Sequence, residues 1–494
     1  MKKWIGTYVL LAVSCLCSAQ NLHTISQTNL SGIYAPLANP ANAVGGIHRA
    51  SFSALGVGVS LRNNALRSYL DYELIRFGDY GPWRMEVGSL DSATFTLPRS
   101  YVKNPRINAQ VDVLQIGGLL AINKKVSLYA FARERAFVNV DNTSYETLKF
   151  LNQNSESHTS PVGSLSLNAR TLAYQELVIG MAWQMYEHRS HYWKMGLSVK
   201  RLNGRSLYMV EVPRVDATLG VEGVRVSGEL NIWETAMDLA TQNPTQFLLK
   251  PAMGAGAAAD IGIVYEHRPK HLKTTFKRNN LKKRTKFFAQ KDRVLYDYKL
   301  GFSLHEIGAI RFSKEVLQHK HTRIQSQFDT SDLGDLTLES YTEELIQDGK
   351  TSITNQSRQF RLPSLACISY DQRLYNGWFL MASYRQNLLK PNGLSFYQPT
   401  DVYFQVRQER SIVVYGFTAY AVPSTRTYTL GAYGQVGPFF MGTDNLGTLF
   451  FRKMYNPSFY LGVFHSIRYK KDPTIENHRS FRTKNRRWYD WTEM

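Results

Sequence analysis

The sequence feature that most constrains the fold is a strict alternation of apolar and polar residues over segments of ten or more residues. In "WKMGLSVKRLNG", residues 193–204, the odd positions 193–199 hold Trp, Met, Leu and Val, and the even positions 194–200 hold Lys, Gly, Ser and Lys. A period of two places these sets on opposite faces of a β-strand. The same pattern recurs in residues 428–437 and 459–469. The chain is therefore expected to be all-β.

Strand length separates the architectures that share this alternation. A soluble sandwich or propeller and a barrel in an outer membrane both alternate apolar and polar residues. The alternating segments here exceed the five or six residues typical of soluble strands and match the roughly 9 to 11 residues of a tilted membrane strand. A mean hydropathy of -0.31 argues against an α-helical membrane protein, and no repeat of propeller length is visible. Length favours a transmembrane barrel.

The connections between strands give a second argument for a barrel. Short joins at residues 123–125, 187–191 and 374–376 alternate with long joins at 63–107, 140–165, 204–253 and 315–360. Outer-membrane barrels alternate short periplasmic turns with long outer loops. We expect an antiparallel transmembrane β-barrel over residues 50–469, with about 14 strands, an even number. The strands are predicted near residues 50–62, 108–122, 126–139, 166–186, 192–203, 254–266, 297–314, 361–373, 377–387, 400–409, 411–421, 426–436, 440–452 and 457–469.

The N-terminus has the layout of a secretory signal peptide. Lys2 and Lys3 precede an apolar run from Trp4 to Cys17, and small residues follow up to Ala19. We expect residues 1–19 to be cleaved and the mature chain to begin at residue 20. A membrane anchor is the weaker alternative, because the run is shorter than the roughly 20 residues that span a bilayer.

Cysteine usage agrees with export. Cys15 and Cys17 lie in the signal peptide, which leaves Cys367 alone in the mature chain. A disulfide framework and a cysteine-based metal site are therefore excluded. Lipid attachment at Cys15 is an open alternative to simple cleavage. Cys367 is expected to be a small apolar residue on a strand.

Two basic segments carry most of the formal net charge of +20. Residues 268–293 hold eleven Lys and Arg against one acidic residue, Asp292, and the tail over residues 470–494 is also basic. Counting strands places both segments in the periplasm. They are either solvated faces or docking surfaces for an acidic protein or for anionic headgroups, and an exported chain is not expected to bind nucleic acid. The docking candidates are Lys277, Arg278, Lys282, Lys283, Arg284, Lys286, Arg486 and Arg487.

The enzymatic motifs in the chain are incomplete. "HEIGA", residues 305–309, lacks the second histidine of a zinc-protease motif and has strand-like flanks. "GAGAAA", residues 254–259, leads into a strand, whereas a dinucleotide-binding loop opens a helix. A hydrolase with dispersed Ser, His and Asp stays open, with His465 and Asp371 as conceivable members. We assign no catalytic residue, no metal ligand and no cofactor, and expect a non-enzymatic protein.

Several short motifs resemble a known family. The "NPAN" at residues 39–42 before the first strand, "GAGAAADIGIVYEHRP", "LGFSLHEIGAIRF" and "MGTDNLGTLFF" are similar to an uncharacterised outer-membrane barrel family of the Bacteroidetes. That family resembles FadL-type fatty-acid transporters and the PorV and PorP barrels associated with type IX secretion. The resemblance covers most of the mature chain. It implies a barrel in the cell outer membrane, surrounded by its lipid.

The resemblance gives a role to the uncharged stretch "IYAPLANPANAVGG", residues 33–46. Its prolines and glycines exclude a helix or an inner strand, and in FadL-like barrels the corresponding segment folds into the lumen as a hatch. Asn39, Pro40 and Ala41 match the Asn-Pro-Ala motif of those hatches, and Asn42 is a further hydrogen-bonding residue. We predict a hatch over residues 20–49. A disordered periplasmic leader is the alternative.

Three functions follow as hypotheses. The first is a barrel that binds or passes hydrophobic small molecules in the manner of FadL-like proteins. The second is an accessory barrel that docks a secretion or surface-assembly machine through its basic segments. The third is an outer-membrane hydrolase. The basic insertion favours docking, whereas the uncharged hatch and the apolar residues 207–253 favour a lipophilic ligand.

Overall fold

The computed structural model describes most of the strands and the segment before them. The described residues are 22–64, 67–69, 94–96, 105–123, 125–144, 163–188, 190–220, 223–235, 252–268, 296–328, 350–374, 377–389, 396, 398–410, 413–423, 427–447, 453–454 and 456–468. The predicted signal peptide, most of the basic insertion and the basic tail lie outside them. Within the described residues, no helix is both long enough and apolar enough to cross a membrane.

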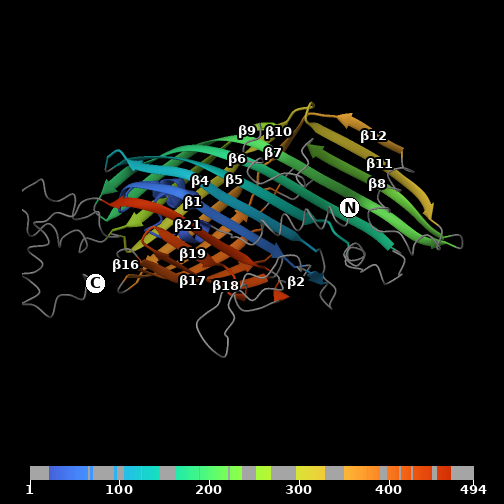
Figure 1. The fold of residues 1–494 in the computed structure, drawn as a ribbon. Helices are drawn as coiled ribbons and strands as arrows, with labels where there is room; N and C mark the ends of the chain where they lie inside the picture. Colours follow the sequence, from blue (N-terminus) through green and yellow to red (C-terminus); the bar gives the residue numbers. More distant parts are fainter. Residues whose placement is uncertain are drawn as a thin grey trace, which may run out of the picture.

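Fourteen described strands form a closed antiparallel β-barrel (Figure 1). Each strand pairs with the next along the chain, and β1 pairs with both β4 and β21, which closes the ring. The prediction of an all-β barrel with about 14 strands is confirmed. The strands are β1 (His48–Asn63), β4 (Ile107–Ala121), β5 (Val126–Asp141), β6 (Gly163–His188), β7 (His191–Gly220), β9 (Gly254–His267), β10 (Tyr298–Phe312), β14 (Leu365–Arg373), β15 (Trp378–Asn387), β16 (Asp401–Arg410), β17 (Val413–Val422), β18 (Thr427–Val436), β19 (Phe439–Thr443) and β21 (Ser458–Arg468).

The two ends of the barrel differ. The short joins predicted at 123–125, 187–191 and 374–376 all lie at one end, here called the short-turn end. At that end β10 begins where β9 stops, since Tyr298 pairs with His267, and β21 stops where β1 begins, since His48 pairs with Arg468. The long joins lie at the opposite, long-loop end.

Three of the predicted long loops are wrong in part, because they contain strands. Residues 208–220 of β7 continue past the barrel and pair with β8 (Gly223–Thr235), which pairs with β11 (Leu317–Phe328), which pairs with β12 (Lys350–Asn355). This sheet, here called the extension, projects from the long-loop end (Figure 1). A short strand, β13 (Arg358–Arg361), pairs with β10, and a small separate sheet contains β2 (Arg67–Tyr69), β3 (Thr94–Thr96) and β20 (Lys453–Met454).

The predicted strand at 440–452 is also too long. β19 ends at Thr443, because side-chain hydrogen bonds turn the chain there. The Asn445 amide donates to Thr443 Oγ1 (3.1 Å), and the Gly447 amide donates to Asn445 Oδ1 (3.0 Å). Local bonds of this kind compete with the ladder bonds of a sheet.

The barrel is apolar outside and charged inside. On β7, Val199 is 60% exposed whereas the adjacent Lys200 is 3% exposed. The outward positions of other strands follow Val199, with Ile179 on β6 at 72% and Phe417 on β17 at 62%. A soluble protein buries its apolar residues and exposes lysine, so this inverted distribution is that of a wall whose outer face meets lipid.

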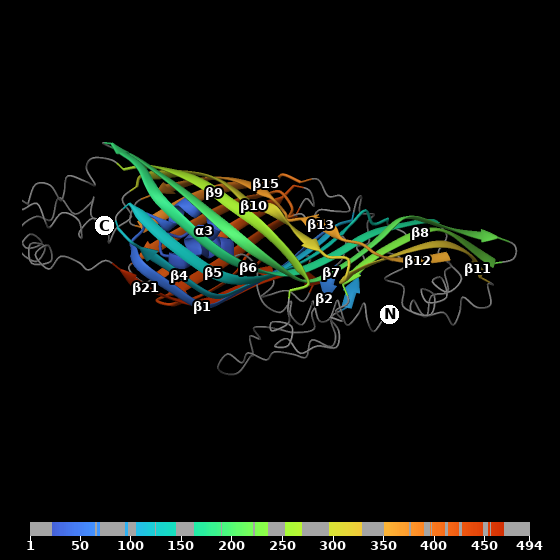
Figure 2. The same cartoon turned by 90° about the horizontal axis from the view of Figure 1, so that it is seen from above.

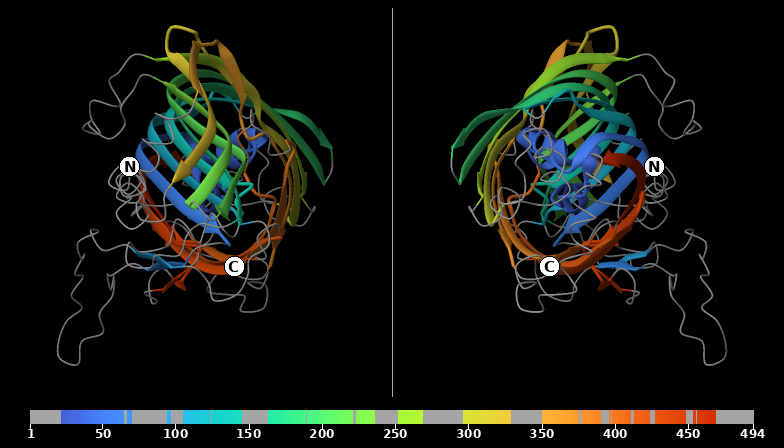
Figure 3. Two further views of the ribbon diagram at one scale, coloured as in Figure 1. Left: turned by 90° about the vertical axis from the view of Figure 1, so that its right-hand side faces the viewer. Right: turned by 90° about the vertical axis from the view of Figure 1, so that its left-hand side faces the viewer.

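The segment before β1 lies inside the ring of strands (Figures 2 and 3). It contains α2 (Leu22–Ser26), η2 (Gly32–Tyr34), α3 (Ala35–Ala38) and η3 (Pro40–Ala43), and residues 22–47 are here called the plug. The expectation that residues 33–46 exclude a helix is wrong for single turns, because Pro36 and Pro40 lie in the first turns of α3 and η3, where a missing amide donor costs nothing. Its apolar side chains pack with inward residues of the wall into one core. The first strand begins at His48, two residues before the predicted start.

The outer face generates a test with a matched pair of isoleucines. Ile179→Arg places a charge on the apolar wall, and a bilayer should penalise it by about 2–4 kcal/mol near its midplane. Ile353 is 61% exposed on β12 of the extension, so Ile353→Arg should change the free energy of unfolding little. The measurement is urea unfolding of the barrel folded into lipid vesicles. Equal stability of the two variants would contradict a lipid-facing wall.

Candidate functional site: the plug seat and the luminal charge layer

The Asn-Pro-Ala turn of the plug is fixed by the side chain of Asn39. Asn39 ends α3 in an extended conformation, and its Oδ1 accepts a hydrogen bond from the Ala41 amide (2.9 Å). Pro40 begins η3, where its missing amide donor costs nothing. The Asn39 side chain therefore acts as an N-cap, and its amide nitrogen stays available for the barrel wall.

The free amide of Asn39 attaches the plug to two adjacent strands. Nδ2 donates to the carbonyl oxygen of Phe302 on β10 (3.0 Å) and to that of Ile263 on β9 (3.3 Å). Asn39 is 3% exposed. A net hydrogen bond contributes about 1 kcal/mol, so these contacts position the plug without fixing it permanently.

Three glycines on neighbouring strands make room for this turn, and together they are called the plug seat: Gly196 on β7, Gly262 on β9 and Gly301 on β10. A Cβ atom on Gly262 would lie 2.1 Å from Asn39 Oδ1, and one on Gly196 would lie 2.3 Å from the backbone of Pro40. Gly196 and Gly262 are paired across the strands. At Gly196 and Gly262, no side chain larger than hydrogen fits beneath the turn without displacing it, whereas a Cβ on Gly301 would lie 3.4 Å from Asn39 Nδ2.

Apolar and polar contacts hold the rest of the plug. Tyr34 is fully buried, its hydroxyl lies 2.6 Å from Ser53 Oγ, and its ring packs edge-on against Phe440. Nearer the start of the plug, Thr24 donates to Asp444 (3.0 Å). Asn29 donates to Tyr296 (2.8 Å). The plug therefore contacts the wall on several sides.

A band of buried ionic side chains crosses the lumen next to the plug and is here called the charge layer. Glu176 lies at its centre, accepting from Arg133 Nε (3.1 Å) and Arg135 Nη1 (3.2 Å). Lys200 donates to Asp260 (3.0 Å). The layer consists of Asp112, Arg133, Arg135, Glu176, Lys200, Asp260 and Glu306, all at most 7% exposed.

A β-bulge in β10 directs Glu306 into this layer. The pairing of β10 with β9 shifts between Leu304 and Ile307, and Glu306 has a φ of 59°, in the left-handed region that non-glycine residues rarely adopt. As a result His305 and Glu306 are both buried on one strand. The Glu306 amide donates to Asp260 Oδ1 (2.7 Å), and its carboxylate pairs with Arg133 and Arg135.

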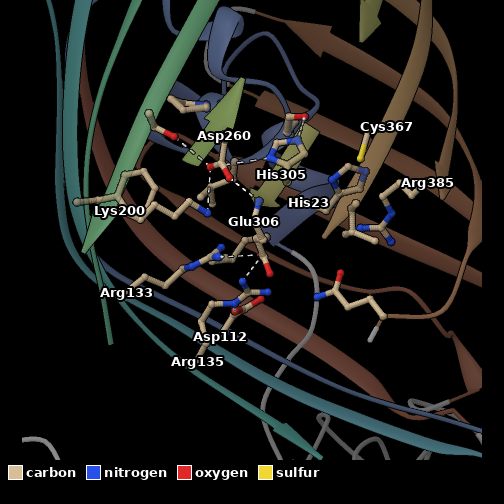
Figure 4. A pocket seen from close by; sticks show the side chains of 18 of the residues that line it. His23, Asp112, Arg133, Arg135, Lys200, Asp260, His305, Glu306, Cys367 and Arg385 are labelled. Carbon is tan, nitrogen blue, oxygen red and sulfur yellow. Dashed lines mark hydrogen bonds and ion pairs between the residues drawn. The ribbon is translucent and has the colours of Figure 1, made fainter. Parts of the chain in front are cut away.

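A polar cavity of about 70 Å³ lies between the plug and the charge layer (Figure 4). Leu22, His23 and Ala38 of the plug line one side, and Glu306 and Arg385 belong to the barrel side. Burial, and to a lesser extent the Arg385 guanidinium, hold the pKa of His23 well below its ordinary value. The His23 imidazole is therefore neutral at physiological pH.

Ser303, His305 and Asp260 come together but do not form a catalytic triad. Ser303 Oγ lies 2.8 Å from His305 Nε2, yet the carbonyl oxygen of Ala38 lies 3.2 Å from the same nitrogen. That carbonyl only accepts, so Nε2 carries the proton and cannot serve as a base for the serine. His305 Nδ1 is 4.0 Å from Asp260, too far for a hydrogen bond.

The structure separates the other residues considered for chemistry. His465 is exposed on the outer face of β21, whereas Asp371 on β14 is buried inside, paired with Arg407 (2.7 Å). They do not share a site. Among the described residues, no group of three or more His, Cys, Asp and Glu is placed to hold a metal ion.

The structure describes the predicted hatch residues but not the predicted docking residues. Asn39, Pro40, Ala41 and Asn42 lie in the plug, where Asn39 and η3 contact strands of the barrel wall. The eight docking candidates from Lys277 to Arg487 lie outside the described residues. Arg268, the first residue of the basic insertion, is described and is paired with Glu266 (2.9 Å).

The plug seat and the charge layer were missed by the sequence analysis. The seat had a signal, since the similar tetrapeptides "MGLS", "IGIV" and "LGFS" each carry one of its glycines. The sequence signal for the charge layer was weaker, and consisted of charged residues at alternate positions such as Arg133 and Arg135. The bulge at Glu306 had no sequence signal, because "HEIGA" has the pattern of an ordinary strand.

The plug seat generates a test that uses the native cysteine. Gly262→Ala should displace the Asn-Pro-Ala turn and expose Cys367, which is 7% exposed and lines the cavity with plug residues. Its labelling by a hydrophilic maleimide should become severalfold faster. A Cβ on Gly434 meets no atom within 4 Å, so Gly434→Ala is the matched control. Unchanged labelling in Gly262→Ala would show that the seat does not hold the plug.

The charge layer generates a test of stability. Lys200→Met leaves Asp260 and Glu176 with less positive charge in a buried place, which typically costs 3–5 kcal/mol. Lys320 pairs with Glu234 at the surface and is 35% exposed, so Lys320→Met should cost about 0–1 kcal/mol. The measurement is the urea midpoint of the folded barrel. Similar midpoints for both variants would mean that the layer adds no stability.

Comparisons with known proteins give a family and distant structural likenesses. No curated protein matches the chain. A TodX monoaromatic hydrocarbon channel mutant is similar with 10% identity over 88% of this chain and 93% of that chain, at a TM-score of 0.41. The Pseudomonas putida toluene transporter TodX is similar with 9% identity over 90% of this chain and 96% of that chain, at a TM-score of 0.38. A Pseudomonas aeruginosa FadL homologue is similar with 10% identity over 88% of this chain and 94% of that chain, at a TM-score of 0.27.

TM-scores this low carry no argument, and the barrel assignment rests on the strand pairings. The family match does carry an assignment: a model described as a family of unknown function, DUF5723, matches residues 56–444, which is well over half of the chain. The chain belongs to this family of unknown function.

Proposed function

We propose that this chain is an outer-membrane barrel that binds or passes hydrophobic small molecules, with the plug controlling access to the lumen. The observation that carries the proposal is the inverted wall, apolar at Val199 and charged at Lys200, around a segment seated by reversible contacts. The apolar outer face supports a membrane location. A cleaved signal peptide over residues 1–19 accounts for export.

The order of layers along the lumen supports a controlled route. On two strands, the next inward position on the long-loop side of the layer is apolar: Phe137 follows Arg135 on β5, and Leu202 follows Lys200 on β7. These residues belong to a buried, aromatic-rich group, here called the apolar cluster: Phe137, Leu172, Tyr174, Leu202, Leu207, Met209, Trp233, Ala258, Ile310, Phe312, Leu317, Phe360, Leu362 and Phe396. A hydrophobic ligand would associate there first.

The charge layer and the plug lie beyond the apolar cluster and oppose such a ligand. Desolvating buried ionic groups without new partners is costly, and the polar cavity of about 70 Å³ is too small for a fatty acid. We propose that passage requires displacement of the Asn-Pro-Ala turn, or that the ligand leaves laterally through the wall before it reaches the layer.

Uptake measurements test the proposal. The barrel is expressed in the outer membrane of a host that lacks its own fatty-acid barrel, and entry of radiolabelled oleate and toluene is followed. Wild type should exceed the empty vector, and Gly262→Ala should raise the rate further if passage goes through the lumen. Gly434→Ala should match wild type. Rates equal to the vector for wild type and Gly262→Ala, with the barrel present in the membrane, would refute transport.

A docking role is the second candidate, and one observation favours it. The basic insertion joins β9 to β10, and the basic tail follows β21, so both leave the barrel at the short-turn end. Their charges would present one surface to an acidic periplasmic partner, as in an accessory barrel of a type IX-like secretion machine. Affinity purification with and without residues 270–291 tests this role. A stoichiometric partner lost on deletion supports it.

We propose a non-enzymatic role in either case. The closest approach to a hydrolase site, Ser303 and His305, presents a protonated Nε2 that is held by the Ala38 carbonyl. This arrangement supplies no base while the plug is seated.

A further inference from the structure

The cavity between the plug and the charge layer contains an incompletely bonded acid. Glu306 Oε1 is paired with Arg133 and Arg135. Glu306 Oε2 is buried without a hydrogen-bond partner among the described residues, although the side chain lines the cavity and the residue is 5% exposed. Leaving a buried charged acceptor without a hydrogen bond is unfavourable, because its hydration is lost and nothing replaces it.

The backbone conformation of Glu306 also directs its carboxylate toward the cavity. Its left-handed conformation is one that non-glycine residues rarely adopt, and the bulge keeps the carboxylate in the lumen, whereas a regular strand would place residue 306 on the outer face. Ser364 Oγ donates to the Glu306 carbonyl oxygen (2.9 Å), so a neighbouring strand segment holds this geometry. A strained, buried acid that faces a cavity is the kind of group that binds a ligand.

Charges of both signs surround the cavity. The charge layer holds four carboxylates, Asp112, Glu176, Asp260 and Glu306, and three cations, Arg133, Arg135 and Lys200, and the cation Arg385 also lines the cavity.

The other cationic or titratable groups beside the cavity are engaged elsewhere. Arg385 binds Asp401 through two hydrogen bonds (2.8 and 2.6 Å), and Asp401 also pairs with Arg62. His305 Nε2 donates toward Ala38, and His23 Nε2 lies 3.1 Å from Gln27. Among the described residues beside the cavity, none therefore donates a hydrogen bond to Glu306 Oε2.

We propose that this cavity binds a primary ammonium group that donates a hydrogen bond to Glu306 Oε2. An ammonium supplies one charge and three N–H donors, which suits a carboxylate. A divalent metal would need several oxygen ligands, and no suitable group occurs among the described residues. The volume of about 70 Å³ exceeds the roughly 10–15 Å³ needed by one water molecule, so a small head group fits with water.

The ammonium can come from two sources. One is the α-amino group of the mature chain, because the signal peptide is predicted to end at Ala19 and Leu22 lines the cavity. Two extended residues span at most roughly 7 Å. In an uncleaved chain the nitrogen of residue 20 is an uncharged peptide nitrogen, so binding of the α-amino group would couple removal of the signal peptide to seating of the plug.

The other source of the ammonium is a free small amine.

Selective acetylation distinguishes the first source. The barrel is purified from outer membranes, intact mass establishes a free α-amine, and acetylation of that amine is followed by mass spectrometry at pH 7. If the terminus binds Glu306, Glu306→Gln should accelerate acetylation about tenfold, equivalent to one pKa unit, and Glu306→Asp should preserve part of the protection. Glu134 is equally buried but does not line the cavity, so Glu134→Gln should react like wild type.

Added amines test the second source. Methylammonium should raise the unfolding temperature of wild type and Glu134→Gln but not of Glu306→Gln, whereas tetramethylammonium, which has no N–H donor, should have no effect. Heat-modifiable gel mobility checks that each variant is folded.

Glu306-dependent α-amine protection or Glu306-dependent stabilisation by methylammonium supports the site and identifies the source. If neither depends on Glu306 in folded protein, the site is disproved. Uptake is not measured in either arm, so the result is independent of the transport proposal.

Discussion

Closure of the sheet by the pairing of β1 with β21 is the constraint on which the rest of the structure depends. A closed ring leaves no open edge, and every strand then has one face outside and one face in the lumen. With an apolar outer face, the polar half of each alternating pattern must point inward. That geometry buries residues such as Lys200 and Glu176, which must be paired because isolated buried charges are unstable.

The plug and the charge layer fill different parts of the barrel lumen. Near the short-turn end, helical turns from residues 22–47 fill the lumen and bury apolar side chains against the wall. Beyond them, where the plug ends, the wall residues fill the space themselves with ion pairs, and then with the apolar cluster. The glycines of the plug seat connect the two regions, because their missing side chains admit Asn39 to the backbone of β9 and β10.

The sequence was sufficient to predict the strands of the barrel wall, but not the arrangement of side chains in the lumen. Period-two alternation marks each wall strand locally, so all fourteen were placed from patterns such as residues 193–200. The extension was missed because β7 continues for 30 residues, well past the length that a bilayer requires. The charge layer depends on which strands are neighbours, and on the bulge at Glu306. One extra residue there reverses the facing of a side chain, and no local pattern announces it.

The energetics of the plug favour local opening over ejection. Six apolar plug residues, Leu22, Ile25, Ile33, Tyr34, Val44 and Ile47, are each at most 6% exposed. Burying such a side chain contributes about 1.5–3 kcal/mol, so removing the whole plug would cost roughly 10 kcal/mol or more, far beyond thermal populations. The Asn-Pro-Ala turn is different, because its direct attachment is two hydrogen bonds of about 1 kcal/mol each. If this lumen serves as a route, we therefore expect it to open at Asn39 while the apolar body of the plug stays in place.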